Sequence, residues 1–269
     1  MKNMAILVCS CDKYEDVWNP MFEMFYKFWP DCPYDVYLLT NNKTYNHDRV
    51  KTITTGDDVS WSKAFRKALN EINEEYVLII MEDYILQSKV RNSDFEIAIE
   101  YIKKNNIDYF RTFPAPRPTK YIGECGDFKV GLIEPNAPYR VSLQSAIWKR
   151  KYAISIIDDK DSAWQFEHMG SKRSATDGSY FVSVWDKKPR MMLDYYCTGV
   201  IQGYWIKEAV ELCNKYGVCV DTSRVPLEPR SVRFRRLFSV NYLGPIKNII
   251  KKTKLYDMYR AKKYAQVTK

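Results

Sequence analysis

Apolar and polar positions alternate in blocks along the first hundred residues, and these blocks predict a repeating order of strands and helices. The continuous apolar run at 76–81 (Tyr-Val-Leu-Ile-Ile-Met) is typical of a buried strand, and residues 4–9 form a second such run. We expect strands at residues 4–9, 34–40, 50–54 and 76–81, and helices at 16–29, 60–72 and 94–104. This order is typical of a doubly wound, mostly parallel α/β sheet, in which ligands bind beyond the carboxyl ends of the strands.

The second half of the chain has a weaker pattern. A predicted strand at 107–113 ends at Pro114, Pro116 and Pro118, which mark a loop. We expect further strands at 141–148 and 180–186, helices at 150–157 and 206–216, short strands or a mobile loop at 121–140, and a loop at 158–178. The α/β pattern therefore continues, without a visible internal repeat.

Length and composition are those of an ordinary folded domain. With 269 residues, 46% of them hydrophobic, and only ten glycines, the chain is neither collagenous nor wholly disordered. Its apolar runs are far shorter than the roughly 20 residues that span a bilayer, and its start lacks a signal-peptide pattern. Seven cysteines lack paired metal-binding spacing, so we expect reduced thiols in a cytoplasmic protein.

The formal net charge of +9 is concentrated in one segment. Residues 224–269 carry 13 Lys or Arg against two acids, so the first 223 residues are slightly acidic. Between 231 and 264, apolar residues at helical spacing alternate with bases, which predicts an amphipathic helix on an anionic membrane surface. The alternatives are a phosphate-binding arm and a solvated helix packed on its own domain. The apolar residues weigh against the phosphate-binding arm, and we expect no nucleic acid as partner.

Two acids follow the most hydrophobic predicted strand directly. Glu82 and Asp83 stand at its carboxyl end, where oxygen ligands can hold Mg²⁺ or Mn²⁺, and the cation in turn a diphosphate. The alternative is that either acid caps the strand end or the turn after it.

Another acid, Glu167, follows Trp164 and Phe166 in a stretch predicted as loop. A carboxylate between aromatic side chains can be partly desolvated, which suits a general base that removes a hydroxyl proton. The alternative is a surface acid paired with Lys172 or Arg173.

Three short motifs occur in a fixed order along the chain: Ser10-Cys11-Asp12, Glu82-Asp83-Tyr84 and Trp164-Gln165-Phe166-Glu167. Together they resemble GT-A fold nucleotide-sugar glycosyltransferases, specifically the small bacterial inverting enzymes, related to family two, of capsule and lipopolysaccharide assembly. The resemblance implies a Rossmann-like GT-A domain at 1–223 with a mostly parallel central sheet and flanking helices. Its nucleotide-sugar half is expected at about 1–113 and its acceptor half at about 114–223, followed by the basic amphipathic extension at 224–269.

The resemblance also implies roles for individual residues. The expected nucleotide contacts are Ser10, Cys11, Asp12, Thr40 and Asn41, with Trp61 and Lys63 nearby and Glu82 and Asp83 at the diphosphate. Asp83 is the expected ligand of Mn²⁺ or Mg²⁺, whereas Tyr84 departs from the Asp-X-Asp signature of the family. Glu167 matches the catalytic base. An acceptor cleft is expected among the following residues: Gln144, Trp148, Tyr180, Trp185, Tyr195, Tyr196 and Trp205.

The expected function is transfer of a sugar from a nucleotide-activated donor, with UDP as the nucleotide, to a saccharide or lipid-linked acceptor. The enzyme would work on the cytoplasmic face of the cell membrane, held peripherally. One alternative is a sugar nucleotidyltransferase, although the loop after the first strand lacks the glycines of a phosphate-binding loop. Another is a non-catalytic nucleic-acid-binding protein, for which the near-neutral first 223 residues offer no broad basic surface.

Overall fold

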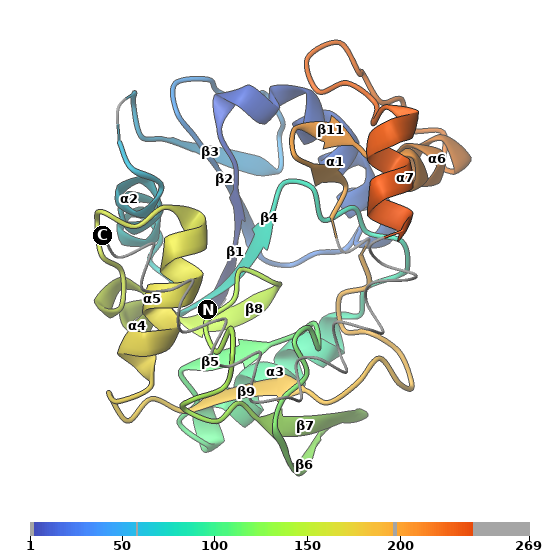
Figure 1. Ribbon diagram of the computed structural model, residues 1–269. Coiled ribbons are helices and arrows are strands. Elements are labelled where there is room, and N and C mark those ends of the chain that lie inside the picture. Colours follow the sequence, from blue (N-terminus) through green and yellow to red (C-terminus); the bar gives the residue numbers. More distant parts are fainter. Residues whose placement is uncertain (1–2, 58, 196–197, 239–269) are drawn as a thin grey trace.

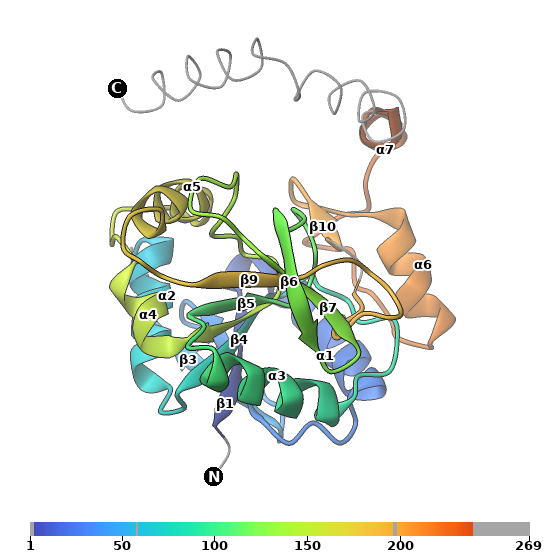
Figure 2. The same cartoon turned by 90° about the horizontal axis from the view of Figure 1, so that it is seen from below.

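A mixed β-sheet forms the centre of the molecule, with helices on both faces (Figures 1 and 2). The computed structural model describes residues 3–57, 59–195 and 198–238. Within these residues, nine strands pair in the order β3-β2-β1-β4-β8-β5-β9-β7-β6. The α/β class expected from the sequence is therefore confirmed.

The first four strands form a fully parallel half of the sheet, as the apolar runs predict. They are β1 (Met4–Cys9), β2 (Asp35–Thr40), β3 (Val50–Thr54) and β4 (Tyr76–Met81). The helices between and after them are η1 (Asp12–Tyr14), α1 (Glu15–Phe28), α2 (Trp61–Glu71) and α3 (Asn92–Lys104). All of these strands and α-helices match the predicted ranges closely, because each combines a clear hydrophobic period with a polar boundary.

The second half of the sheet is mixed, so the prediction of a mostly parallel sheet is wrong there. Its strands are β5 (Tyr109–Arg111), β6 (Lys120–Cys125), β7 (Phe128–Leu132), β8 (Ala146–Lys149) and β9 (Phe181–Val184). Strand β8 runs antiparallel to both β4 and β5, and β7 runs antiparallel to β6 and β9. The reason is that residues 133–145 carry the chain to the carboxyl edge of β4 before β8 begins.

The sheet separates two hydrophobic layers. Along the fully buried β1, residues such as Ile6 pack toward α1 and α3, whereas Leu7 and its alternates pack toward α2. Both views show α2, α4 (Arg150–Ser155) and α5 (Ala163–Ser174) together on one side of the sheet (Figures 1 and 2).

Helix α5 occupies a stretch that the sequence analysis predicts as loop, and that prediction is wrong. Ser162 caps the helix, its side chain accepts from the backbone of Gln165, and the Gln165 side chain accepts from the backbone of Ser162. This capping box is the local reason why the helix begins there.

The last described elements are joined to α1 through Arg224 and to one another through Arg236. They are β10 (Val200–Ile201), β11 (Tyr204–Trp205), α6 (Lys207–Lys215) and α7 (Arg230–Phe238). Arg224 pairs with Glu15 and its backbone N–H donates to Asp16, while Arg236 of α7 binds Glu208 and Glu228 at 2.6 Å each. Residues on both sides of position 223 thus contact the sheet domain.

The predicted membrane-contacting segment, 231–264, lies beyond residue 238 for most of its length and so outside the described residues. Among the helices that the structure describes, none combines the length and the apolar character needed to cross a membrane.

Candidate active site

The strand order reverses its direction at β1, which pairs with β2 on one side and with β4 on the other. Cys9 and Met81, the last residues of β1 and β4, lie opposite each other. Ser10 and Glu82 therefore leave the sheet side by side, at the kind of switch point where open α/β sheets bind ligands.

Glu82 is a buried carboxyl group at this edge. Only 7% of the residue is exposed, and its Oε2 atom has no hydrogen-bond partner among the described residues. Burial, together with the charge of Asp83, raises its pKa to about 8. At neutral pH the side chain is thus protonated unless a positive charge stands beside it.

Asp83 ties the end of β4 to a distant segment. Its Oδ2 accepts hydrogen bonds from the Thr198 hydroxyl at 2.6 Å and from the N–H groups of Gly199 and Val200 at 3.2 Å each. Burial raises the pKa of Asp83, and these three hydrogen bonds oppose that shift. Gly199 is required by close packing, since a Cβ there would stand 2.9 Å from the Asp83 carbonyl oxygen.

Asp12 joins the loops that follow β1 and β2. Its carboxylate accepts from the N–H groups of Asn41 at 2.9 Å, Asn42 at 3.0 Å and Lys43 at 3.2 Å. Thr40 is buried, and its hydroxyl donates to the Lys43 carbonyl at 2.7 Å. Asp12, Thr40 and Asn41 therefore come together at one edge, where their side chains hold the two loops to each other and the second loop to itself.

Ser10 and Cys11 complete the loop after β1. The Ser10 hydroxyl accepts from the Trp18 indole N–H at 2.7 Å. Cys11 is half-buried, and burial raises the pKa of its thiol. Both residues lie next to Glu82 because of the register of β1 and β4.

Glu167 lies on α5 with an oriented carboxylate. Its Oε1 accepts from the N–H of Leu143 at 2.8 Å and from the Ser142 hydroxyl at 3.2 Å. Burial raises the pKa of Glu167, whereas these bonds oppose the rise. Arg173, proposed from the sequence as its ion-pair partner, binds Asp161 at 2.6 Å instead.

Residues 142–145 bring Glu167 to the same edge as Glu82 and Asp83. They precede β8, whose first residue Ala146 lies opposite Ile79 of the antiparallel β4. The Tyr84 hydroxyl donates to the Leu143 carbonyl at 3.1 Å, on the residue whose N–H binds Glu167. Two acidic groups from distant parts of the chain thus flank one segment at the carboxyl edge of β4.

Trp61 and Lys63 lie in the first turn of α2. Trp61 stacks on Phe65 at 4.9 Å between ring centroids and contacts Phe166 of α5 at 5.5 Å. Lys63 is exposed, and its backbone N–H donates to the cap residue Ser60 at 3.1 Å. Trp61 therefore joins α2 to the Glu167 helix, while the Lys63 side chain faces solvent.

The expected acceptor cleft is in part wrong. Trp148, Tyr195 and Trp205 are at most 2% exposed and belong to the core, because they pack between the sheet and its covering segments. Tyr196 lies outside the described residues. Sequence reasoning also missed Ser142, whose role depends on contact with a residue 25 positions away.

The donor set at Glu82 and Asp83 fits a divalent cation that is shared with a ligand. The described residues contain no cluster of three or more acidic, His or Cys side chains, so a cage made wholly of protein groups is absent from that part of the chain. Mg²⁺ is commonly held by one or two carboxylates plus substrate phosphates. The unpaired Oε2 of Glu82 is a buried oxygen atom that such a cation would satisfy.

No protein-family model and no curated protein matches this chain. Solved structures that match include S. aureus TarS 1–349 in complex with UDP, at 14% identity and a TM-score of 0.49, covering 95% of this chain and 77% of that one. The mannosyltransferase PcManGT from Pyrobaculum calidifontis, in complex with GDP-Man and Mn²⁺, matches at 11% identity and a TM-score of 0.46, covering 70% and 56%.

The bifunctional IspDF from Campylobacter jejuni matches at 16% identity and a TM-score of 0.41, covering 72% of this chain and 52% of that one. This chain thus spans about half the length of IspDF and of PcManGT.

Proposed function

We propose that this chain is an inverting glycosyltransferase of the GT-A type. It transfers a sugar from a nucleotide-activated donor, with UDP as the first nucleotide to test, to a saccharide or lipid-linked acceptor in bacterial surface polysaccharide synthesis. The observation that carries the proposal is that residues 142–145 link the Glu167 carboxylate to the switch-point edge where Glu82 and Asp83 stand.

The donor occupies the edge formed by β1, β2 and β4. Ser10, Cys11 and Asn41 stand at the nucleoside, where Asp12 and Thr40 hold the two loops in place through backbone hydrogen bonds. Lys63, at the start of α2, is the exposed cation that faces the diphosphate. Asp83 and Glu82 would hold Mn²⁺ or Mg²⁺, which supplies charge neutralisation for the leaving diphosphate.

Glu167 acts on the acceptor. Its carboxylate takes the proton from the acceptor hydroxyl as that oxygen forms a bond to the anomeric carbon. The bond from that carbon to the diphosphate breaks on the opposite face, so the configuration inverts and the nucleoside diphosphate leaves with its electron pair. The hydrogen bonds from Leu143 and Ser142 orient the Glu167 carboxylate for this transfer.

The donor part of the proposal is tested by ligand-dependent melting. UDP, GDP and CDP are each added with and without Mn²⁺, and we expect one diphosphate to raise the melting temperature only with the cation. Asp83→Asn keeps an oxygen acceptor for Thr198, so the apo-protein should melt normally while losing this ligand-induced shift. A shift that survives in Asp83→Asn would contradict the assigned cation site.

The reaction class is tested by the product. A glycosyltransferase releases a nucleoside diphosphate from a nucleotide sugar, whereas a sugar nucleotidyltransferase releases pyrophosphate from a nucleoside triphosphate. Incubation with UDP-sugars and with UTP plus sugar phosphates separates the two. Pyrophosphate release would replace the present proposal with the nucleotidyltransferase alternative.

We also propose that the basic segment 231–264 holds the enzyme peripherally at an anionic membrane surface. Truncation after residue 238 keeps the ion pairs of Arg236 with Glu208 and Glu228, so it removes bases without breaking the described contacts. We expect this truncation to lose co-sedimentation with anionic vesicles. Unchanged co-sedimentation would overturn the membrane proposal and leave the catalytic one intact.

A further inference from the structure

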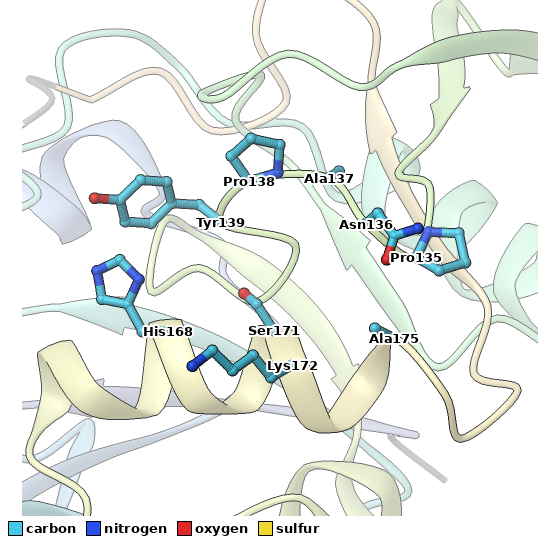
Figure 3. Close-up of a pocket in the computed structure, with 9 residues that line it drawn as sticks. All are labelled: Pro135, Asn136, Ala137, Pro138, Tyr139, His168, Ser171, Lys172 and Ala175. Carbon is cyan, nitrogen blue, oxygen red and sulfur yellow. The ribbon is translucent and has the colours of Figure 1, made fainter. Parts of the chain in front are cut away.

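A cavity of about 220 Å³ opens between residues 135–139 and helix α5 (Figure 3). This volume lies below the roughly 300 Å³ at which sites for drug-sized ligands begin, so it suits a single ring-sized group. Tyr139 contributes one wall, and His168, Ser171 and Lys172 of α5 contribute the other. None of these residues belongs to the donor edge described above.

Two buried arginines hold the loop wall of this cavity in place. Arg111 and Arg140 are at most 1% exposed, and their described hydrogen-bond partners are carbonyl and hydroxyl oxygens. Arg111 donates to the Tyr139 carbonyl at 2.7 Å and to the Arg140 carbonyl at 2.8 Å. Arg140 donates to the carbonyls of Ile133 and Ser179, the latter at 2.6 Å. The wall is thus fixed from behind before any ligand arrives, which lowers the entropy cost of binding.

Tyr139 itself has an unfavourable backbone conformation. Its φ of +51° lies in the left-handed region, which is uncommon for an aromatic residue. The bond from Arg111 to its carbonyl oxygen helps to hold this conformation, and the residue remains 38% exposed at the cavity. Strain of this kind is concentrated at ligand sites.

The cavity combines aromatic surface with positive charge. The His168 ring lies 5.0 Å from the Tyr139 ring and 4.3 Å from the exposed Trp164 ring, measured between centroids. Lys172 stands one helical turn after His168. The nine lining residues include no Asp or Glu, and the guanidinium groups of Arg111 and Arg140 lie behind the loop. A ligand with one apolar face and a negative charge complements these walls.

The cavity is also close to the proposed base. Ser171 lines the cavity, and its hydroxyl donates to the carbonyl oxygen of Glu167 at 2.5 Å. Four residues of helix, a rise of about 6 Å, separate Glu167 and Ser171 along α5. This separation is on the scale of one sugar ring.

We infer that this cavity binds an anionic sugar unit of the acceptor, next to the unit that receives the transferred sugar. The ring stacks on Tyr139 and His168, and Lys172 binds its carboxylate or phosphate. That the bound sugar belongs to an acceptor rests on the proposed function. That the cavity binds an anionic sugar rests on the cavity residues alone.

The test uses the full-length protein with 5-fluorotryptophan, whose Trp164 signal is assigned with Trp164→Phe. Methyl glucuronide, glucose 6-phosphate, methyl glucoside and inorganic phosphate are each titrated while the fluorine spectrum is recorded. We expect at least one of the two anionic sugars to bind tenfold or more tightly than methyl glucoside, and the better one to identify the charged group. Equal affinity for methyl glucoside, or equal affinity for inorganic phosphate, would overturn the inference.

Variants connect this binding to the named residues. Lys172→Ala should reduce the preference for the anionic sugar to threefold or less, while Lys104→Ala, an exposed lysine on α3, should leave it unchanged. Asparagine tolerates the left-handed conformation, so Tyr139→Asn should keep the backbone while it weakens the binding of both the anionic sugar and methyl glucoside. A preference that survives Lys172→Ala would also overturn the inference.

Asp83→Asn separates the two proposals. This variant should lose the nucleotide-dependent shift and keep the binding of the anionic sugar, because the cavity contains no donor-edge residue. If the wild-type protein binds the sugar and no nucleotide, the glycosyltransferase proposal fails and the cavity assignment stands. If the wild-type protein binds nucleotide and neither anionic sugar, the cavity assignment fails and the glycosyltransferase proposal stands.

Discussion

The proposed donor edge, formed by β1, β2 and β4, and helix α5 each contain a desolvated glutamate, and the two differ in what surrounds the carboxyl group. Glu167 accepts hydrogen bonds from Leu143 and Ser142, which favour and orient its ionised form. Glu82 is more deeply buried, its Oε2 has no described partner, and its pKa is raised to about 8. Burial alone therefore does not define a role. A buried carboxylate that accepts hydrogen bonds is ready to act as a base, whereas one without them stays protonated at neutral pH unless a cation stands beside it.

The largest expected effect comes from Glu167→Gln. Glutamine keeps an oxygen that accepts from Leu143 N–H and loses the proton-accepting charge, so kcat should fall about 10²–10⁴-fold while the affinity for nucleoside diphosphate stays unchanged. Steady-state kinetics and nucleotide titration measure the two quantities. Glu96→Gln, an exposed glutamate on α3, is the matched control. A kcat within threefold of wild type would remove Glu167 from the role of base.

Glu82→Gln should act on stability instead. The native pKa of about 8 lies above the ordinary value of 4.5, so the native state binds more protons than the unfolded state between these values. The stability contribution of Glu82 is therefore complete below about pH 4.5 and is lost as the pH rises through about 8.

Glutamine does not ionise, so the Glu82→Gln variant should escape this loss. The change in the free energy of unfolding that the substitution causes should be about 2–4 kcal/mol more favourable at pH 8.5 than at pH 4.5, since one pKa unit corresponds to about 1.4 kcal/mol. Urea unfolding of both proteins in a chelator at the two pH values measures this double difference. An identical effect at both values would contradict the buried, unpaired state of Glu82.

The contrast between the two regions extends to how much the sequence reveals. The donor edge follows strands with continuous apolar runs, so their positions and the placement of Glu82 at a strand end can be predicted locally. Glu167 is correctly predicted as a desolvated acid, yet its helix is missed although Ser162 and Gln165 form a capping box. Its hydrogen-bond donors could not be predicted, because they depend on the antiparallel entry of β8 and on residues 24 and 25 positions away.

A third prediction concerns the carboxylate that joins the two donor loops. Asp12→Ala removes the acceptor for the N–H groups of Asn41, Asn42 and Lys43, so we expect the free energy of unfolding to fall by about 1–2 kcal/mol. Nucleotide affinity should fall as well, while binding of the anionic sugar at the α5 cavity stays unchanged. Asp48→Ala, at an exposed residue between β2 and β3, provides a comparison. Loss of sugar binding in Asp12→Ala would show that the two regions are not independent.

The smallest expected effects come from removing one lysine charge in each region, Lys63 at the donor edge and Lys172 at the α5 cavity. Lys63 stands exposed at the start of α2, so Lys63→Ala should weaken nucleoside diphosphate binding by about 0.5–1 kcal/mol, and less at high salt. Lys67→Ala, on the next turn of the same helix, should change this affinity less, because its amino group binds the Thr54 carbonyl. Lys172→Ala should show the opposite pattern, with nucleotide affinity retained and anionic-sugar affinity lowered. Titration of each variant with both ligands measures all of these effects. If Lys172→Ala lost as much nucleotide affinity as Lys63→Ala, one shared electrostatic field would govern binding, and the two regions would not be separate subsites.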